Sequence, residues 1–422
     1  MSISSPSKKS HALIQNEHAS AKPRVLFVLG TLWGENGITT HMLTLAKGLI
    51  NNGWTVALAS GLANDIEGAS EEAKVALERF ELNDIPAFVI SFPKIHLSIN
   101  GVIKVTRALR ELNKVVNQFQ PDVIHLHSLS VCPYIQIIRL LHSIPFVSTC
   151  HAEPDGNRVG VKFSGLAGRH LKTLFGKRLI AVSSALVEAY QTIMNVPKEN
   201  IRLIYHGVDP NQFRPPTAEE QLKAHQSFGL DDHDKVICLV GRLSPAKGHR
   251  LLIEALAILQ HRGVDAIVLC AGKGYADEEN QIRKLASQLE VFESVRFLGM
   301  TDTRQVLWAS DILVLPSRPN TEAFGLVVSE AMLCGVVPIR TPAAGAIDQI
   351  DEGKNGFIVP FDDAETLALR LSEVLANPEL QARLAAAAIA TAHQKFTVNQ
   401  MVESTIAVYE EILNHPESSL MQ

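Results

Sequence analysis

Residues 317–332 read SRPNTEAFGLVVSEAM, and this stretch decides the fold of the second half of the chain. An apolar run, Ile312–Leu315, precedes it and predicts a buried strand of a parallel sheet. Pro316 and Pro319 end that strand, and a helix is expected to begin near Phe324 and to continue through the apolar residues that follow. The stretch therefore predicts a strand, a loop and a helix of an α/β fold.

Two carboxylates in this stretch are candidates for binding a ligand. Glu322 lies in the predicted loop and Glu330 on the predicted helix, eight residues later, which places it about 80° beyond two full turns. Both can therefore face one side, with the amides of Phe324, Gly325 and Leu326 between them at the positive end of the helix. Alternatively, Glu322 complements the helix dipole and Glu330 is solvated. The apolar neighbours of Glu330 favour a buried carboxylate that needs a partner, such as a sugar hydroxyl.

The composition limits the class of protein. A chain of 422 residues suits two domains of about 200 residues each, and its net charge of −5 argues against nucleic acid as a partner. The five cysteines are scattered within apolar runs and indicate small core residues in a reducing compartment. No zinc-binding spacing occurs, so no metal is expected. Residues 1–22 predict a disordered tail, and no apolar run approaches the length of a membrane span. We therefore expect a cytoplasmic protein, or one attached peripherally to the inner face of the membrane.

Strand-like and helix-like runs alternate along the chain, which predicts βαβ units and mainly parallel sheets. In the first half, strands are expected at residues 25–29, 55–59, 87–92, 123–127, 146–150, 179–183 and 201–205. A polar segment at about 210–234 follows. In the second half, strands are expected at 236–240, 266–270, 295–298, 312–315, 336–340 and 357–359, with helices from His249, Glu278, Thr303, Phe324 and Ala364. The pattern predicts two Rossmann-like, doubly wound domains, whose ligands bind at the carboxyl ends of the strands.

Three strand ends carry further candidate residues. Gly37 lies in the glycine-containing loop 30–41, either near a bound phosphate or as part of a flexible turn before a helix entering at His41. His151 follows the strand 146–150, and it is either a structural histidine or a functional one. Arg242 and Lys247 follow the strand 236–240, and two cations in a glycine-flanked loop suit a diphosphate, although they are also compatible with a solvated surface.

A basic segment at residues 160–178 holds five Lys and Arg residues, no acid, and interleaved Phe and Leu residues. Such a segment predicts an amphipathic helix that lies on an anionic membrane surface. The alternative is a solvated helix packed on the face of the domain.

The ordered set His151, Arg242, Lys247, Glu322 and Glu330 resembles glycosyltransferase family four, and the resemblance covers most of residues 24–410. It implies the GT-B fold, with two Rossmann-like domains facing an interdomain cleft. The expected domains are 23–209, with a C-terminal crossing helix at about 397–416, and 210–396. The resemblance also implies a retaining transfer of a sugar from a UDP- or GDP-linked donor to a hydroxyl acceptor, a lipid or glycan of cell-envelope or exopolysaccharide synthesis. No cofactor is expected besides the nucleotide-sugar donor substrate.

The same resemblance assigns roles to the candidate residues. It places Arg242 and Lys247 on the donor phosphates, Glu322 on the sugar hydroxyls, Glu330 on the ribose and His151 on the donor sugar, with Gly37 near the phosphates. Phe324, Gly325 and Leu326 add backbone amides to the donor site. Two other functions stay open: a GT-B nucleotide-sugar epimerase, and a non-catalytic protein that binds nucleotide sugars. An epimerase would convert the donor without any acceptor, and a binding protein would show no turnover.

Overall fold

The computed structural model describes residues 22–34, 36–63, 69–94, 98–154, 175–274 and 276–414. The predicted tail up to residue 21 and the basic segment up to residue 174 lie outside the described residues. The chain divides into two compact units. Unit 1 comprises Met1–Val182, Leu186–Gly207 and Val398–Gln422, and unit 2 comprises Ser183–Ala185 and Val208–Thr397.

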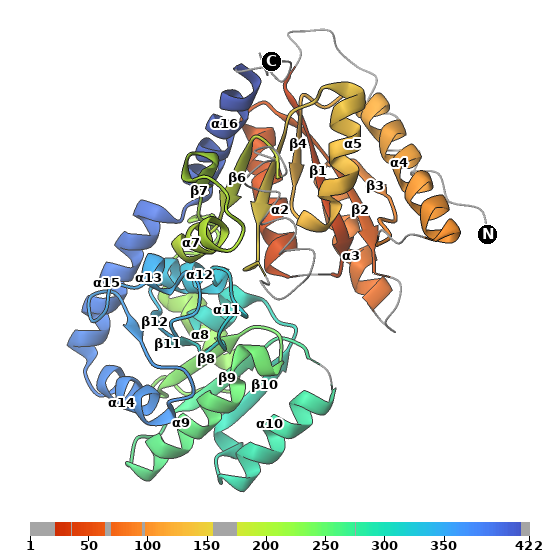
Figure 1. Ribbon diagram of the computed structural model, residues 1–422. Helices are drawn as coiled ribbons and strands as arrows, with labels where there is room; N and C mark the ends of the chain where they lie inside the picture. Colours follow the sequence, from red (N-terminus) through yellow and green to blue (C-terminus); the bar gives the residue numbers. More distant parts are fainter. Residues whose placement is uncertain are drawn as a thin grey trace. The chain divides into compact units, whose positions relative to one another are not determined.

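Unit 1 is built on a parallel sheet of seven strands in the order β3-β2-β1-β4-β5-β6-β7. The strands are β1 (Arg24–Leu32), β2 (Thr55–Leu62), β3 (Ala87–Val89), β4 (Val123–Leu126), β5 (Phe146–Cys150), β6 (Arg178–Ala181) and β7 (Ile201–Leu203). The central strands β1, β4 and β5 are almost wholly buried, because helices cover both faces of the sheet (Figure 1).

The helices of unit 1 are α2 (Gly37–Asn51), α3 (Ala69–Glu81), α4 (Ile99–Phe119), α5 (Cys132–His142), α7 (Ser184–Thr192) and α16 (Val398–Asn414). The last of these, α16, packs beside α2 although the whole of unit 2 separates them in sequence (Figure 1). Its residues Met401, Val402, Tyr409 and Ile412 belong to the same apolar core as β1 and α2. The core of unit 1 is therefore completed by the end of the chain.

Unit 2 is built on a second parallel sheet, of six strands in the order β10-β9-β8-β11-β12-β13. These are β8 (Val236–Val240), β9 (Ile267–Ala271), β10 (Val295–Gly299), β11 (Ile312–Leu315), β12 (Val337–Arg340) and β13 (Phe357–Ile358). Its helices are α8 (Ala218–Ser227), α9 (His249–His261), α10 (Ala276–Gln288), α11 (Thr303–Trp308), α12 (Leu326–Cys334), α13 (Ala346–Gln349), α14 (Ala364–Leu375) and α15 (Pro378–Lys395). The predicted fold class of two doubly wound α/β sheets is confirmed.

Three predicted helix starts are wrong, one of them that of α10, which begins at Ala276 and not at Glu278. Helix α2 begins at Gly37 and not at His41, because the Asn36 side chain accepts hydrogen bonds from the Ile38 and Thr39 amides, at 2.9 and 3.1 Å, and caps the helix there. Helix α12 begins at Leu326 and not at Phe324.

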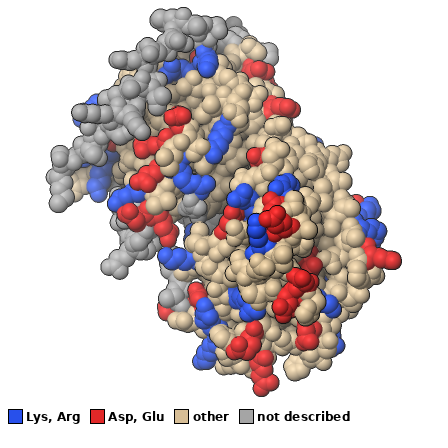
Figure 2. All heavy atoms as spheres, turned by 180° about the vertical axis from the view of Figure 1, so that it is seen from behind, with Lys and Arg blue, Asp and Glu red and all other residues tan. Residues whose placement is uncertain are grey.

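The surface of the described residues carries both signs of charge. On the face seen in Figure 2, Lys and Arg side chains are interspersed with Asp and Glu side chains. Arg178, at the end of the predicted basic helix, instead begins strand β6 and pairs with Glu411 of α16 at 2.5 Å. Among the described helices, none is long and apolar enough to cross a membrane.

Candidate active site

The loop after β8 places Lys247 at the carboxyl edge of the second sheet. Lys247 ends a short 3-10 turn, Pro245–Lys247, and Gly248 follows it with φ of +72°. A Cβ atom on Gly248 would overlap the carbonyl oxygen of Pro316, so only glycine allows the two loops to approach this closely. The ammonium group of Lys247 is thereby brought to the loop that follows β11.

Lys247 and Glu322 form an ion pair with 2.6 Å between Nζ and Oε2, and both side chains are partly buried. Ser317 adds a hydrogen bond from its Oγ to the same carboxylate oxygen, at 3.3 Å. The structure thus brings together a proposed phosphate ligand and a proposed sugar ligand. The ion pair fixes the orientation of both groups, and fixed charges of this kind are used at catalytic sites.

Three loops are tied to one another around this pair. The Arg318 amide and the Thr321 hydroxyl both donate to the carbonyl oxygen of Ala246, at 2.9 and 3.0 Å. The Thr341 hydroxyl donates to the carbonyl oxygen of Ser317 at 2.5 Å. The loops after β8, β11 and β12 therefore form one hydrogen-bonded frame at the carboxyl edge of the sheet, where doubly wound folds bind their ligands.

Arg242, the second predicted phosphate ligand, follows β8 directly and is exposed. Within the described part of the chain, the structure gives its guanidinium no ion pair. Arg242 is therefore available to bind an anionic ligand at the strand end. Lys247 differs, because it is already paired with the Glu322 carboxylate.

The N-terminus of α12 differs from the predicted one. Gly325 has a φ of +83° and is the N-cap, so the first helical amides belong to Leu326 and Val327, and Val328 donates to the Gly325 carbonyl. Phe324 stands before the helix with its side chain buried against Phe396. The amide of Phe324 is thus not one of the first-turn amides.

A buried arginine that the sequence analysis did not single out supports this loop. The Arg340 guanidinium is fully buried at the end of β12 and donates to the carbonyl oxygens of Phe324 and Ala344, at 2.8 and 3.0 Å, and to the Gln349 side chain. Gln349 in turn donates to the carbonyl oxygen of Gly325 at 3.1 Å. Burial lowers the pKa of Arg340 to about 10, so the group stays charged at neutral pH. The signal available in the sequence was an arginine that ends an otherwise apolar strand.

Glu330 lies on α12, four residues into the helix. Burial of its carboxyl group raises its pKa from 4.5 to about 7, although the residue as a whole keeps some exposure. A carboxylate in such a place gains from a ligand that donates hydrogen bonds to it. This is consistent with the sequence prediction that Glu330 needs a polar partner.

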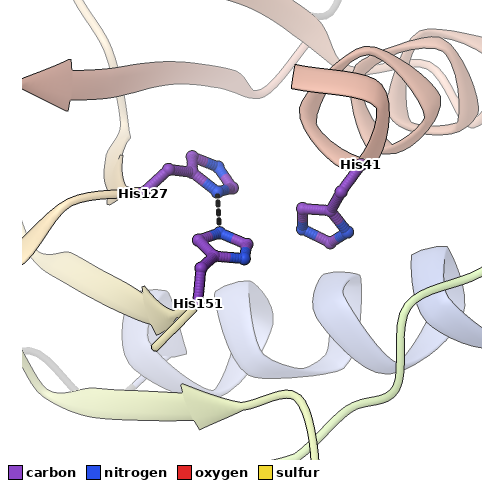
Figure 3. Close-up of side chains that lie close together, drawn as sticks. All are labelled: His41, His127 and His151. Atoms are coloured by element: carbon purple, nitrogen blue, oxygen red, sulfur yellow. Dashed lines mark hydrogen bonds between the residues drawn. The ribbon is translucent and has the colours of Figure 1, made fainter. Parts of the chain in front are cut away.

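In unit 1, His151 follows β5 and belongs to a group of histidines drawn in Figure 3. His127 follows β4, and its Nδ1 lies 3.2 Å from Nε2 of His151. His41 projects from the first turns of α2 toward both rings, with ring centroids 5.1 Å from His151 and 5.7 Å from His127 (Figure 3). Sequence analysis found only His151, because the three residues meet only when α2, β4 and β5 are packed.

Two further histidines border this group. His125 on β4 uses both ring nitrogens, Nδ1 with the Tyr409 hydroxyl and Nε2 with the Thr149 hydroxyl, each at 2.6 Å. His206 has its ring centroid 4.3 Å from that of His41. Burial, reinforced by neighbouring imidazoles, lowers the pKa of His41, His127 and His151 well below 6.5, so all three are neutral at pH 7.

Gly37, the remaining predicted residue, is the first residue of α2. A Cβ atom there would meet no described atom within 4 Å. A larger residue would therefore fit at this position without colliding with any described atom.

Two family models match adjacent parts of the chain. Glycosyltransferase Family 4 matches residues 35–212, and Glycosyl transferases group 1 matches residues 220–391. The chain belongs to the glycosyltransferase family that these two models describe, and it is a glycosyltransferase enzyme. The family implied by the ordered set of residues is thereby confirmed.

Proteins similar in sequence to this chain include glycosyltransferases of several kinds. An uncharacterised glycosyltransferase of Methanocaldococcus jannaschii is 26% identical over 89% of this chain and 94% of its own length. D-inositol 3-phosphate glycosyltransferase of Corynebacterium jeikeium is 28% identical over 69% of this chain and 72% of its own. N-acetyl-alpha-D-glucosaminyl L-malate synthase of Bacillus anthracis is 24% identical over 72% of this chain and 78% of its own.

Solved structures share the fold. Anabaena HepE in complex with UDP has a TM-score of 0.77 and 22% identity, over 92% of this chain and all of its own. A glycosyltransferase of Rickettsia africae has a TM-score of 0.78 and 20% identity, over 94% of this chain and all of its own. The chain therefore has the GT-B fold.

Proposed function

We propose that the chain transfers a glycosyl group from a nucleoside diphosphate sugar to a hydroxyl acceptor with retention of configuration. The observation that carries this proposal is the Lys247–Glu322 pair, held by three loops at the carboxyl ends of β8, β11 and β12. A cation and a carboxylate at this edge suit the two parts of the donor, its diphosphate and its sugar hydroxyls.

In the proposed reaction, the bond between the anomeric carbon and the β-phosphate oxygen breaks, and its electron pair stays on the phosphate. The acceptor oxygen forms the new bond on the same face of the sugar, and its proton passes to the leaving phosphate oxygen. Arg242, Lys247 and the first amides of α12 stabilise the growing negative charge, a contribution of about 3–4 kcal/mol for one such donor. The proposal uses no metal ion and no cofactor.

The remaining residues hold the substrates. Glu322 accepts hydrogen bonds from the sugar hydroxyls, and Glu330 accepts them from the ribose. His151 is assigned to the transferred sugar and its acceptor, and its neutral ring can donate or accept a hydrogen bond. Gly37 is assigned to the vicinity of the donor phosphates.

A UDP-sugar is the first donor to test, since HepE was solved with UDP and with UDP-glucose. The test is a thermal-shift series over UDP- and GDP-linked sugars, followed by product analysis with and without acceptors. A preferred donor raises the melting temperature by mass action. Acceptors include lipid and glycan hydroxyls, and also inositol phosphate and malate because two relatives are named for them.

The outcomes separate transfer from the two other functions. Slow hydrolysis of the donor alone and rapid turnover with one acceptor support transfer. An epimerised nucleotide sugar formed without an acceptor would replace transfer by epimerisation. Donor binding without turnover over the whole acceptor panel would leave only a binding protein.

Peripheral membrane contact through residues 160–178 belongs to the same proposal, since a lipid acceptor would bring the enzyme to a membrane surface. Lys172 is the residue to reverse, because Arg178 is already paired with Glu411. Lys172→Glu should weaken sedimentation with anionic liposomes and leave neutral liposomes unaffected. Equal sedimentation of both proteins would end this part of the proposal.

A further inference from the structure

The three histidines of Figure 3 have a geometry that suits a metal ion. One nitrogen from each of His41, His127 and His151 lies within 4.8 Å of the others. The closest pair, Nδ1 of His127 and Nε2 of His151, is 3.2 Å apart. Two imidazole nitrogens bound tetrahedrally to zinc at 2.0–2.1 Å lie about 3.3 Å apart. These two nitrogens share a hydrogen bond, drawn dashed in Figure 3, and a bound ion would replace it at nearly the same nitrogen–nitrogen distance.

The hydrogen bonding of the rings is an independent indication. Both ring nitrogens of His41 are buried and have no hydrogen-bond partner among the described residues, so a bound ion would engage one of them. Leaving such a group unpaired typically costs about 1–3 kcal/mol. The adjacent His125 shows the contrast, since both of its nitrogens are engaged by hydroxyl groups.

We propose that His41, His127 and His151 bind one divalent transition-metal ion of the zinc class. Imidazole is a preferred ligand of zinc, copper, iron and nickel, and all three rings are in the neutral form that ligates metal. A modest shift of the His41 ring closes the triangle, and a fourth position stays open to water. The ion is not assigned to the transfer reaction, but the proposal shares His151 with the proposed transfer site, since an ion on Nε2 would leave only Nδ1 of that ring for a sugar.

The affinity expected is moderate. Ligating histidines usually donate their second nitrogen to a carboxylate or carbonyl, and losing such a partner costs 10–100-fold in affinity. Here the second nitrogens of His127 and His151 have no such partner among the described residues. We therefore expect micromolar and not nanomolar binding of Zn²⁺.

The test is titration of the full-length protein with Zn²⁺ by calorimetry, in the absence of nucleotide sugar. Each protein carries His233→Ala, because Asp231, His233 and Asp234 form an exposed group that could also hold a cation. Co²⁺ then serves as a spectroscopic probe, since tetrahedral nitrogen ligation gives intense visible absorption. We expect one Zn²⁺ per chain, with affinity at least tenfold weaker in His41→Asn and in His127→Asn.

His249→Asn is the matched control, because His249 is also fully buried with two unpartnered nitrogens but lies in unit 2. It should bind Zn²⁺ as the parent does. Circular dichroism excludes variants that fail to fold, and two independent ligand variants keep the test open if one does. The absence of stoichiometric Zn²⁺ binding would overturn the proposal, and so would unchanged affinity in both ligand variants or an equal loss in His249→Asn. In that case water would account for the unpaired nitrogens.

Discussion

Replacement of Glu330 by glutamine should stabilise the free protein at alkaline pH while weakening donor binding. Burial raises the pKa of Glu330 to about 7 from 4.5, so the folded state holds this proton over a range in which the unfolded state has released it. The stability of the wild-type protein therefore falls as pH rises from about 4.5 to 7, and the loss is complete above pH 7. Glutamine has nearly the same shape and carries no charge to desolvate.

The size of the effect follows from the shift of about 2.5 pKa units. At 1.36 kcal/mol per unit, the cost of burying the ionised carboxylate is at most about 3.4 kcal/mol. Because the residue keeps some exposure, we expect about 1–2 kcal/mol. For a unit of this size, that corresponds to an increase of roughly 3–6 °C in melting temperature at pH 8, and to much less at pH 5.

Differential scanning calorimetry of both proteins at pH 5 and pH 8 measures the effect. Glu373→Gln, a substitution of an exposed glutamate on α14, is the control and should change stability by no more than about 0.5 kcal/mol at either pH. The same Glu330→Gln protein should bind the preferred nucleotide sugar more weakly. A difference between Glu330→Gln and wild type that is equal at both pH values would refute the argument from desolvation.

Further predictions concern the other polar groups. Arg242→Ala or Lys247→Ala should reduce turnover at least tenfold with an unchanged circular dichroism spectrum, because each removes a cation from the leaving diphosphate; near-native turnover would remove that assignment. His151→Ala should abolish transfer while keeping the thermal shift produced by the donor, and normal activity would return His151 to a structural role. Arg340→Met should lower the free energy of unfolding by about 3 kcal/mol, since the carbonyl oxygens of Phe324 and Ala344 lose their buried donor. Urea denaturation measures this loss. An unchanged midpoint would show that the hydrogen bonds of the guanidinium only offset the free-energy cost of burying its charge.

Most strands could be predicted from the sequence, because parallel strands buried on both faces appear as short apolar runs bounded by glycine, proline or polar residues. β5 and β11 coincide with their predicted residues. The helix starts were harder, because capping depends on side-chain geometry. Asparagine is a common helix cap, but only the contacts of Asn36 with the Ile38 and Thr39 amides fix the start of α2.

The residues of the candidate site also fall into those that the sequence reveals and those that only the structure reveals. His151, Arg242 and Glu322 could be selected because each follows a predicted strand, and strand ends are where ligands bind. Contacts between loops leave no local pattern, so the Lys247–Glu322 pair and the Arg340 hydrogen bonds were not foreseeable. The three-histidine cluster joins residues that have no metal-binding spacing in the sequence, and it forms only when β4, β5 and α2 pack.

The return of α16 to unit 1 affects how the protein is made. Unit 2 is contiguous apart from Ser183–Ala185, and it is complete on the ribosome before unit 1 receives its last helix. During that interval the surface of α2 that receives Val402 is uncovered, next to Gly48, where even a methyl group would collide with that valine. A protein truncated just before Val398 would consequently keep all of unit 2 but lack α16. Unit 1 would then expose apolar surface that chaperones and proteases recognise.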